Sequence, residues 1–279
     1  PTVSASDVGT SRAYNNGAAT VNISSPTGGL PTSYSITTTP STTTTAGVSG
    51  ANTITGLSSA TSYTVSVTAT NSSATSGATT TSPLTATTIP QAPTVGTPTV
   101  ATGQAYTGNA NVSVPFTPGA TGGKTVSSYT VTSSSGNTQS GASSPIAVSD
   151  VVGTARTYTV TATNANGTST ASSASAVTTP SSVPQAPTIG TVTVTNATTV
   201  SIPFTPGATG GSAITSYTIT SSPSLSLTYS GTSSPFTVTG SFVNGQAYTF
   251  TMTATNANGT SAASSTSNSC LLYTSDAAD

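Results

Sequence analysis

The sequence predicts an all-β fold of three antiparallel β-sandwiches in tandem, with essentially no helix. Two observations predict it: the chain repeats itself about every 90 residues, and within each repeat apolar residues alternate with threonine. Alternation with a period of two is the pattern of a strand with one face buried and one face in water. No stretch of the sequence shows the 3.6-residue apolar spacing of an amphipathic helix.

The repetition defines the domains. Residues 114–123 return almost unchanged as 202–211, and residues 161–169 return as 253–261. A period near 90 residues is that of a whole domain rather than of a solenoid repeat. We therefore divide the chain into a divergent first sandwich, a second, a third and an atypical tail: 1–88, 89–181, 182–269 and 270–279.

Within each repeat, the strand candidates are runs such as 129–131, 158–162 and 248–252, in which tyrosine, valine or phenylalanine alternates with threonine. Clusters of Gly, Pro and Asn separate such runs about every 8–12 residues, as in an antiparallel sandwich. The competing interpretation is a disordered, mucin-like stalk, which residues 37–45 resemble locally. Apolar residues that recur in register across the copies favour the folded sandwiches, with 37–45 as a loop.

The composition argues against catalysis. The 279 residues include 3 basic and 4 acidic side chains and no His, beside 67 Thr and 50 Ser. Histidine is the usual general base near neutral pH and the commonest metal ligand, and a hydroxyl needs an adjacent base to act as a nucleophile. Asp7 and Asp150 lie far apart in the sequence, which disfavours a paired-carboxylate site. We expect no enzyme activity, no cofactor and no metal site.

The same composition bears on partners and location. Three scattered cations cannot neutralise a phosphate backbone, and no apolar run approaches the roughly 18 residues of a membrane span. We therefore expect neither nucleic-acid binding nor a membrane span. Abundant Thr, Ser, Gly and Asn with almost no charge is typical of secreted bacterial or phage surface proteins, so the expected location is extracellular or on a cell or virion surface.

The second and third repeats resemble fibronectin type III domains, in the low-charge tandem form of bacterial and phage surface proteins. The motif Pro-x-Ala-Pro-Thr resembles the opening of strand A, and residues 114–118 and 202–206 resemble strand B. The resemblance implies that the tyrosine opening strand F bonds a nearby backbone group. It also implies a set of core aromatic residues: Phe116, Phe204, Tyr129, Tyr217, Tyr158 and Tyr248, with Tyr34 and Tyr63 in the first repeat.

Two parts of the chain depart from the family pattern. The first repeat lacks the strand B aromatic residue, and its connection from strand B to strand C is about four residues shorter. The last ten residues, 270–279, resemble a sequencing-adapter read-through, and the alternative is a genuine short tail.

Glycosylation sites are the remaining candidates. Hydroxyl residues fill about 42% of positions, so about six sequons among 15 Asn arise by chance. The Asn-Gly pairs at 166–167 and 258–259 also have a second explanation as hairpin turns. The candidates for N-glycans are Asn22, Asn71, Asn111, Asn166, Asn196 and Asn258, and those for O-glycans are Thr42, Thr43 and Thr44.

The near absence of charge leads to a hypothesis for function. Soluble sandwiches usually protect their edge strands with lysine or other charges, and this chain has one lysine. Bound glycans or neighbouring copies of the chain could protect the edges instead. The leading hypothesis is a non-enzymatic extracellular structural protein, a rod that forms or decorates a surface fibre, filament or stalk by self-association. Prolines at 90, 93, 184 and 187 predict stiff linkers.

The alternative hypothesis is a spacer or a carbohydrate- or receptor-binding module of a larger secreted enzyme or phage tail appendage. The partners implied are copies of the chain itself and, in the second case, surface glycans.

Overall fold

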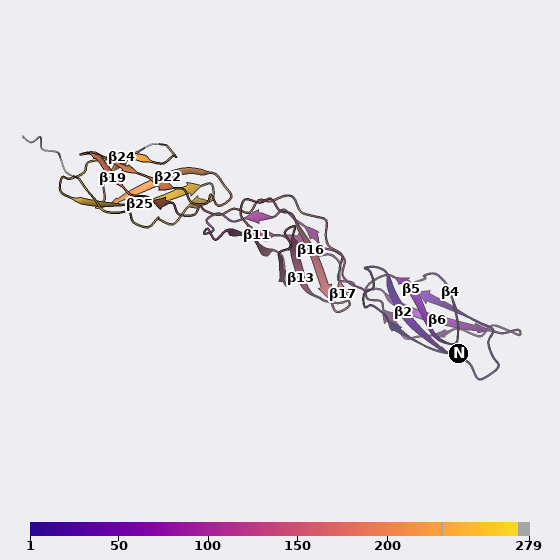
Figure 1. The fold of residues 1–279 in the computed structure, drawn as a ribbon. Coiled ribbons are helices and arrows are strands. Elements are labelled where there is room, and N and C mark those ends of the chain that lie inside the picture. Colours follow the sequence, from indigo (N-terminus) through magenta and orange to yellow (C-terminus); the bar gives the residue numbers. More distant parts are fainter. Residues whose placement is uncertain (230, 273–279) are drawn as a thin grey trace, which may run out of the picture.

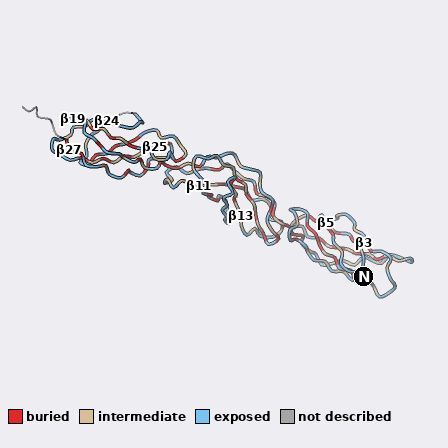
Figure 2. Tube along the Cα trace, in the orientation of Figure 1, coloured by how far each residue is buried: buried red, intermediate tan, exposed pale blue. Residues whose placement is uncertain are grey.

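The structure, a computed structural model, describes residues 1–229 and 231–272. Within these residues there is no helix, and three antiparallel β-sandwiches stand end to end in a rod (Figure 1). Each sandwich has its own cluster of buried apolar residues, and the buried positions run along the middle of each (Figure 2). The predicted fold class is confirmed.

The first sandwich packs a three-stranded sheet against a five-stranded one. The first sheet has the order β1-β2-β5, with β1 (Thr2–Asp7), β2 (Gly17–Ser24) and β5 (Gly50–Leu57). The second has the order β4-β3-β6-β7, with β8 also on β6: β4 (Thr45–Gly47), β3 (Ser33–Thr39), β6 (Ser62–Thr70), β7 (Thr79–Thr80) and β8 (Leu84–Thr85).

The second sandwich repeats this arrangement with shorter edge strands. One face has the order β10-β11-β15, with β10 (Thr99–Val100), β11 (Asn109–Val114) and β15 (Ile146–Val151). The short pair β9 (Thr94–Val95) and β12 (Phe116–Thr117) lies at its start. The other face has the order β14-β13-β16-β17, with β14 (Thr138–Gly141), β13 (Val126–Ser133), β16 (Tyr158–Asn164) and β17 (Gly167–Thr168).

The third sandwich differs from the second in the position of one short strand. One face has the order β19-β20-β24-β23, with β19 (Thr193–Asn196), β20 (Thr199–Ile202), β24 (Phe236–Gly240) and β23 (Leu227–Thr228). In the second sandwich β14 pairs with β13, whereas in the third the short strand β23 pairs with β24, in the opposite sheet. The pair β18 (Thr188–Ile189) and β21 (Phe204–Thr205) accompanies it. The other face has the order β22-β25-β26, with β27 also on β25: β22 (Ile214–Ser222), β25 (Ala247–Asn256), β26 (Gly259–Thr260) and β27 (Cys270–Leu271).

The last strand moves the end of the third sandwich beyond the boundary expected at residue 269. Cys270 pairs with Tyr248 on β25, and the side chains of Cys270 and Leu272 are buried in the core of the sandwich. Residues 270–272 therefore belong to the fold and not to a separate tail. Residues 273–279, the rest of the segment interpreted as a read-through, lie outside the described residues.

The alternation of strand residues builds the core. On β16 every second residue from Tyr158 to Asn164 is buried, as the period of two predicts. The Phe116 and Tyr129 rings pack with centroids 4.8 Å apart, and Phe204 and Tyr217 repeat this contact at the same distance. All eight aromatic residues expected in the core lie inside the sandwiches, with Tyr129 the most exposed at 9%.

A ladder of serines replaces a regular edge strand after β17 and β26. Every third residue of this segment is a serine that makes two hydrogen bonds to one residue of the neighbouring strand. The serine N–H donates to the carbonyl of the strand residue, and the N–H of that strand residue donates to the serine hydroxyl at 3.0 Å. A repeat of three residues is that of a polyproline II helix rather than of a β-strand. The ladder serines are Ser169, Ser172 and Ser175 along β16, and Ser261, Ser264 and Ser267 along β25.

Replacing Ser264 with alanine should destabilise the third sandwich by about 1–3 kcal/mol, because the N–H of the fully buried Met252 loses its acceptor. Ser265→Ala is the matched control, since that side chain is exposed, and it should change the unfolding free energy by less than about 0.5 kcal/mol. Denaturant unfolding of the full chain measures both. Equal effects of the two substitutions would contradict the role given to the ladder hydroxyl.

Candidate functional site: the inter-domain joints

The feature that repeats most faithfully between the sandwiches is the joint that holds one to the next. In the first joint, the β16–β17 turn of the second sandwich covers the linker leaving the first. Asn164 donates from Nδ2 to the carbonyl oxygens of Thr88 (2.9 Å) and Thr121 (2.8 Å), and its Oδ1 accepts the N–H of Asn166 (2.9 Å). Thr88 is completely buried by this contact.

Main-chain bonds close the first joint from two further sides. The N–H of Ser11, in the β1–β2 connection, donates to the carbonyl of Asn166 (2.7 Å), so the first sandwich reaches directly onto the second. Ile89 donates its N–H to the carbonyl of Arg12 (3.0 Å), and Thr88 donates to that of Gly122 (2.8 Å). The linker is therefore bonded on both sides and is not a free hinge.

The second joint repeats these bonds almost one for one. Asn256 donates from Nδ2 to the carbonyls of Ser182 (2.9 Å) and Thr209 (2.8 Å), as Asn164 does in the first joint. Gly103 donates its N–H to the carbonyl of Asn258 (2.8 Å), and Ser182 donates to Gly210 (2.8 Å). The joints differ at Asn258, whose Oδ1 accepts from the Ser181 hydroxyl (3.1 Å), whereas the Nδ2 of Asn166 donates to Thr87 (2.8 Å) and to the carbonyl of Thr88 (3.2 Å).

Glycine is required at the centre of each joint. Gly122 and Gly210 both have φ of +71°, a conformation that L side chains rarely adopt. A Cβ at Gly122 would lie 2.5 Å from the carbonyl oxygens of Thr88 and Ile89, and a Cβ at Gly210 would lie 2.5 Å from those of Ser182 and Val183. The linker backbone can approach the β12–β13 and β21–β22 connections closely only because these two positions have no side chain.

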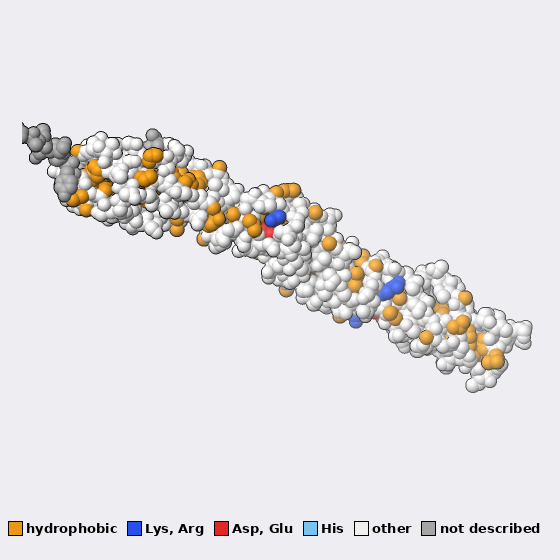
Figure 3. Space-filling model, viewed as in Figure 1, with side chains coloured by type: hydrophobic (Ala, Val, Ile, Leu, Met, Phe, Trp, Pro, Cys, Tyr) orange, Lys and Arg blue, Asp and Glu red, His pale blue; other side chains and the backbone are white. Residues whose placement is uncertain are grey.

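Charged side chains gather near the joints. Among the described residues, Asp7, Arg12 and Lys124 lie around the first joint, and Asp150 and Arg156 lie at the end of the second sandwich that faces the third (Figure 3). Asp7 accepts both the N–H (2.9 Å) and the hydroxyl of Thr87. Its carboxylate thereby fixes the linker to the first sandwich, and Asn166 bonds the same Thr87 from the second.

Asp150 is a completely buried carboxylate with three strong donors. It accepts from the Ser135 hydroxyl (2.7 Å), the Asn137 amide (2.9 Å) and the Tyr158 hydroxyl (3.0 Å). The Arg156 Nε lies 3.9 Å away, close enough for an ion pair but without a hydrogen bond. Burial by itself raises the pKa of Asp150, but the hydrogen bonds to its charged form outweigh it and lower the pKa below its usual value.

The tyrosines at the start of strand F are not all equivalent. Tyr63 and Tyr248 accept the backbone N–H five residues upstream, of Ser58 (2.9 Å) and Val243 (3.2 Å), as the family resemblance implies. Tyr158 does not, because it lies two residues further into its strand, and its hydroxyl donates to Asp150 instead. The serine ladder gives the register: Tyr158 donates its N–H to Ser175, the third ladder serine, as Phe250 donates to Ser267, so Tyr158 corresponds to Phe250 and not to Tyr248.

The structure separates the candidate glycosylation sites. Asn166 is buried, and its Nδ2 donates to Thr87 and Thr88, so a glycan there would require the first joint to open. Asn258 is half-buried in the second joint, and Asn71 is half-buried in the first sandwich. Thr42 bonds Thr38 (2.7 Å). The exposed candidates are Asn22, Asn111, Asn196, Thr43 and Thr44, and their glycosylation stays a prediction.

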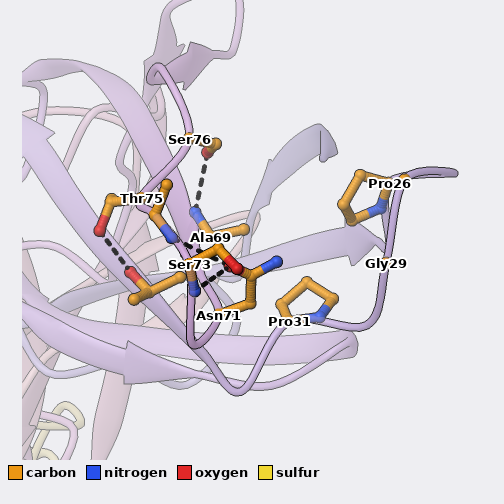
Figure 4. Close-up of a pocket in the computed structure, with 11 residues that line it drawn as sticks. Pro26, Gly29, Pro31, Ala69, Asn71, Ser73, Thr75 and Ser76 are labelled. Carbon is orange, nitrogen blue, oxygen red and sulfur yellow. Dashed lines mark hydrogen bonds between the residues drawn. The ribbon is translucent and has the colours of Figure 1, made fainter.

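A groove opens at the outer end of the first sandwich, with a volume of about 300 Å³. One wall is the β2–β3 connection, with Pro26, Gly29 and Pro31, and the other is the turn after β6 (Figure 4). Asn71 occupies the same position in this turn as Asn164 occupies in the β16–β17 turn of the second sandwich. Its Oδ1 accepts the N–H of Ser73 (2.9 Å), and its amide nitrogen faces the opposite wall.

Within the described residues, no three Asp, Glu, His or Cys side chains come together as a metal site would need, and no helix is long and apolar enough to cross a membrane. The joints, the buried carboxylate and the groove are the remaining candidate sites in the described part of the chain.

Comparison with known proteins assigns no family to the chain. No family model and no curated protein matches the sequence. Domains A168–A170 of titin align over 97% of this chain and 98% of their own, at 17% identity and a TM-score of 0.35. The FN1–FN3 domains of chicken CNTN1 align over 98% of this chain and 97% of their own, at 15% identity and a TM-score of 0.30.

The class of the protein rests on its own strand order. Strands A, B and E are β1-β2-β5, β10-β11-β15 and β19-β20-β24, and they face a sheet with strands C, F and G, which are β3-β6-β7, β13-β16-β17 and β22-β25-β26. This strand order is also that of fibronectin type III and immunoglobulin-like domains. The chain is a tandem array of three sandwiches with this strand order.

Proposed function

We propose that this chain is a non-enzymatic extracellular structural protein, a rod that forms or decorates a surface fibre, filament or stalk by self-association. The observation that carries the proposal is the joint repeated between successive sandwiches. An array with flexible linkers needs no shared bonding pattern, whereas a rod needs each sandwich fixed to the next. Two joints with the same asparagine, glycine and main-chain bonds fit the second requirement.

The chemistry of the joints supports a mechanical role rather than a catalytic one. Asn164 and Asn256 use their amides to satisfy buried carbonyl oxygens, and the linker backbone has no open hinge position. Pro90 and Pro184 directly follow the hydrogen-bonded linker residues Ile89 and Val183, and both prolines are buried. Their fixed φ angles further restrict the backbone conformations of the linkers. A rod of this kind holds what is attached at its two ends apart, with little entropic recoil.

Composition supports the proposed location and partners. Threonine and serine dominate the surface and charge is nearly absent, which fits a secreted protein of bacterial or phage surface type. Copies of the chain are the proposed partners, and glycans at the exposed Asn and Thr candidates would solvate the rod. The serine ladders bear on how copies meet, since they make the G edge of the second and third sandwiches unsuitable for β-pairing.

Small-angle X-ray scattering of the dilute full chain tests the rod. We expect a pair-distance distribution with one early peak and a long, nearly linear decline, because the joints hold three sandwiches in line. The same profile should persist in high salt, since the joints consist mainly of main-chain and amide bonds. A compact envelope, with the sandwiches folded back on each other, would contradict the proposal.

The groove on the first sandwich favours a second candidate, the spacer or binding module of a larger secreted protein. Its two prolines and the Asn71 amide could contact a carbohydrate or a receptor loop. A polysaccharide array probed with the full chain discriminates between the candidates, with Ser73→Trp as the control variant that fills the groove.

A further inference from the structure

Five of the nine exposed large apolar side chains among the described residues lie at the two outer ends of the rod, and the other four, Val8, Tyr14, Val151 and Val177, lie elsewhere on it. At the first sandwich, Leu30 is 86% exposed and Val48 is 64% exposed, and both line a second hollow that shares Pro31 with the groove that contains Asn71. We call Leu30, Val48 and this groove the head surface. At the far end of the third sandwich, Val243 (60%), Leu271 (39%) and Val194 (38%) form what we call the tail surface. Hydrophobic side chains are visible at both ends of the rod in Figure 3.

Charge is distributed in the opposite way. All the charged side chains that the structure describes lie around the two joints, and none of them lies on the head or tail surface (Figure 3). Among the described residues, the head and tail surfaces therefore carry apolar side chains and no charged one. Solitary exposed apolar residues are ordinary, but an apolar group beside a groove marks an interaction site.

The joints show what the loops of the head surface hold elsewhere in the same chain. In the second and third sandwiches, the connection from strand B to strand C and the turn after strand F hold the end of the preceding sandwich. In the first sandwich the same two loops line the open groove. The Nδ2 of Asn71 makes no hydrogen bond within the described structure, whereas the equivalent Nδ2 of Asn164 makes two.

We propose that the head surface docks on the tail surface of a second copy of this chain. The inference rests on the self-association in the proposed function and names the surfaces that carry it. Leu30 and Val48 would pack against Val243 and Leu271, and the Asn71 amide would donate to a backbone carbonyl, as Asn164 and Asn256 do in the joints. Because head and tail differ, the contact is heterologous, and its repetition gives an open filament rather than a closed dimer.

Side-by-side pairing through the G edge is the less favourable arrangement. Along the second and third sandwiches that edge is a serine ladder, whose hydroxyls donate to the carbonyls of the following residues, such as Ser173 and Ser265. Those carbonyls are occupied, and the backbone lacks the two-residue repeat that a β-partner needs. End-to-end docking uses side chains that are exposed among the described residues.

A mixing experiment with two full-length variants tests the contact. Leu30→Glu blocks the head, Val243→Glu blocks the tail, and both sites are exposed, so neither substitution disturbs a core. In analytical ultracentrifugation we expect the parent to grow in mass with concentration and each variant alone to stay monomeric. An equimolar mixture should form dimers and nothing larger, because only one intact head meets one intact tail. Val177→Glu, at a 68% exposed site away from both ends, should assemble like the parent.

Each other outcome overturns the inference in a recognisable way. A variant that dimerises by itself means that like surfaces meet, and a mixture that stays monomeric while the parent assembles means that the contact does not join one head to one tail. Variants that assemble like the parent overturn the head-to-tail contact and leave self-association standing. A parent that is monomeric at every concentration overturns both the contact and the self-association, while the scattering test of the rod is unaffected.

Discussion

Replacing Tyr158 with alanine is expected to destabilise the second sandwich by more than Tyr248→Ala destabilises the third. Both substitutions delete a buried aromatic side chain, which costs about 3–5 kcal/mol. The Tyr158 change also removes one of three donors from the completely buried Asp150, which adds about 1–3 kcal/mol. Denaturant unfolding of the full chain measures both losses against the parent.

The phenylalanine variants separate the hydroxyl from the ring. Tyr158→Phe removes a hydrogen bond to a buried charge, worth about 1.5–3 kcal/mol. Tyr248→Phe removes only the acceptor of the Val243 N–H, and Val243 is exposed, so water replaces the hydroxyl at a cost of about 1 kcal/mol or less. Equal losses for the two variants would contradict the distinct roles of the two hydroxyls.

The dependence of stability on pH gives the same comparison a second readout. The pKa of Asp150 is lower in the folded chain than its ordinary value of 3.8. Its carboxylate therefore stabilises the fold fully above that value, and the contribution is lost as the pH falls through the folded pKa. Tyr158→Phe removes one of the donors that lower the pKa, so the variant should lose less stability on acidification than the parent does.

The sequence was sufficient to predict the sandwiches but not the register of Tyr158. Alternation and repetition depend on the period of buried residues, and β16 and β25 both have that period. The prediction that Tyr158 and Tyr248 occupy equivalent positions rested only on the residue type. In the structure, the position of Tyr248 in the third sandwich corresponds to that of Arg156 in the second. The exact repeat from 161–169 to 253–261 would have aligned Tyr158 with Phe250.

The joints are present in the sequence as its best-repeated segments, which from the sequence alone are interpreted as strand B and as a hairpin turn that contains a sequon. Asn164 and Gly122 lie in the two segments that return almost unchanged, 161–169 and 114–123. Turn chemistry explains an Asn-Gly pair or a glycine in isolation. It does not explain why two separate turns repeat together, and only the fold shows that both close on the same linker. The serine ladder was not predicted from the sequence for a related reason, because its period of three residues is neither that of a β-strand nor that of an α-helix.

Replacing Gly210 with alanine should open the second joint while both adjoining sandwiches stay folded. The new Cβ would lie 2.5 Å from the carbonyl oxygens of Ser182 and Val183, so the linker must move away. The bonds from Asn256 to Ser182 and from Ser182 to Gly210 are then lost together. The third sandwich should become free to swing, and its NMR relaxation should report tumbling independent of the other two.

Gly245→Ala separates this effect from backbone strain. Gly245 has φ of +76°, close to that of Gly210, and a Cβ there meets nothing within 4 Å. Both substitutions therefore cost the third sandwich about 1–2 kcal/mol of left-handed strain, but only Gly210→Ala displaces the linker. Small-angle scattering should show a shorter, broader distance distribution for Gly210→Ala and the profile of the parent for Gly245→Ala.

Gly122→Ala should loosen the first joint in the same way, since its φ and both of its close contacts match those of Gly210. Identical rods from all three variants would mean that the repeated bonds do not hold the sandwiches in line.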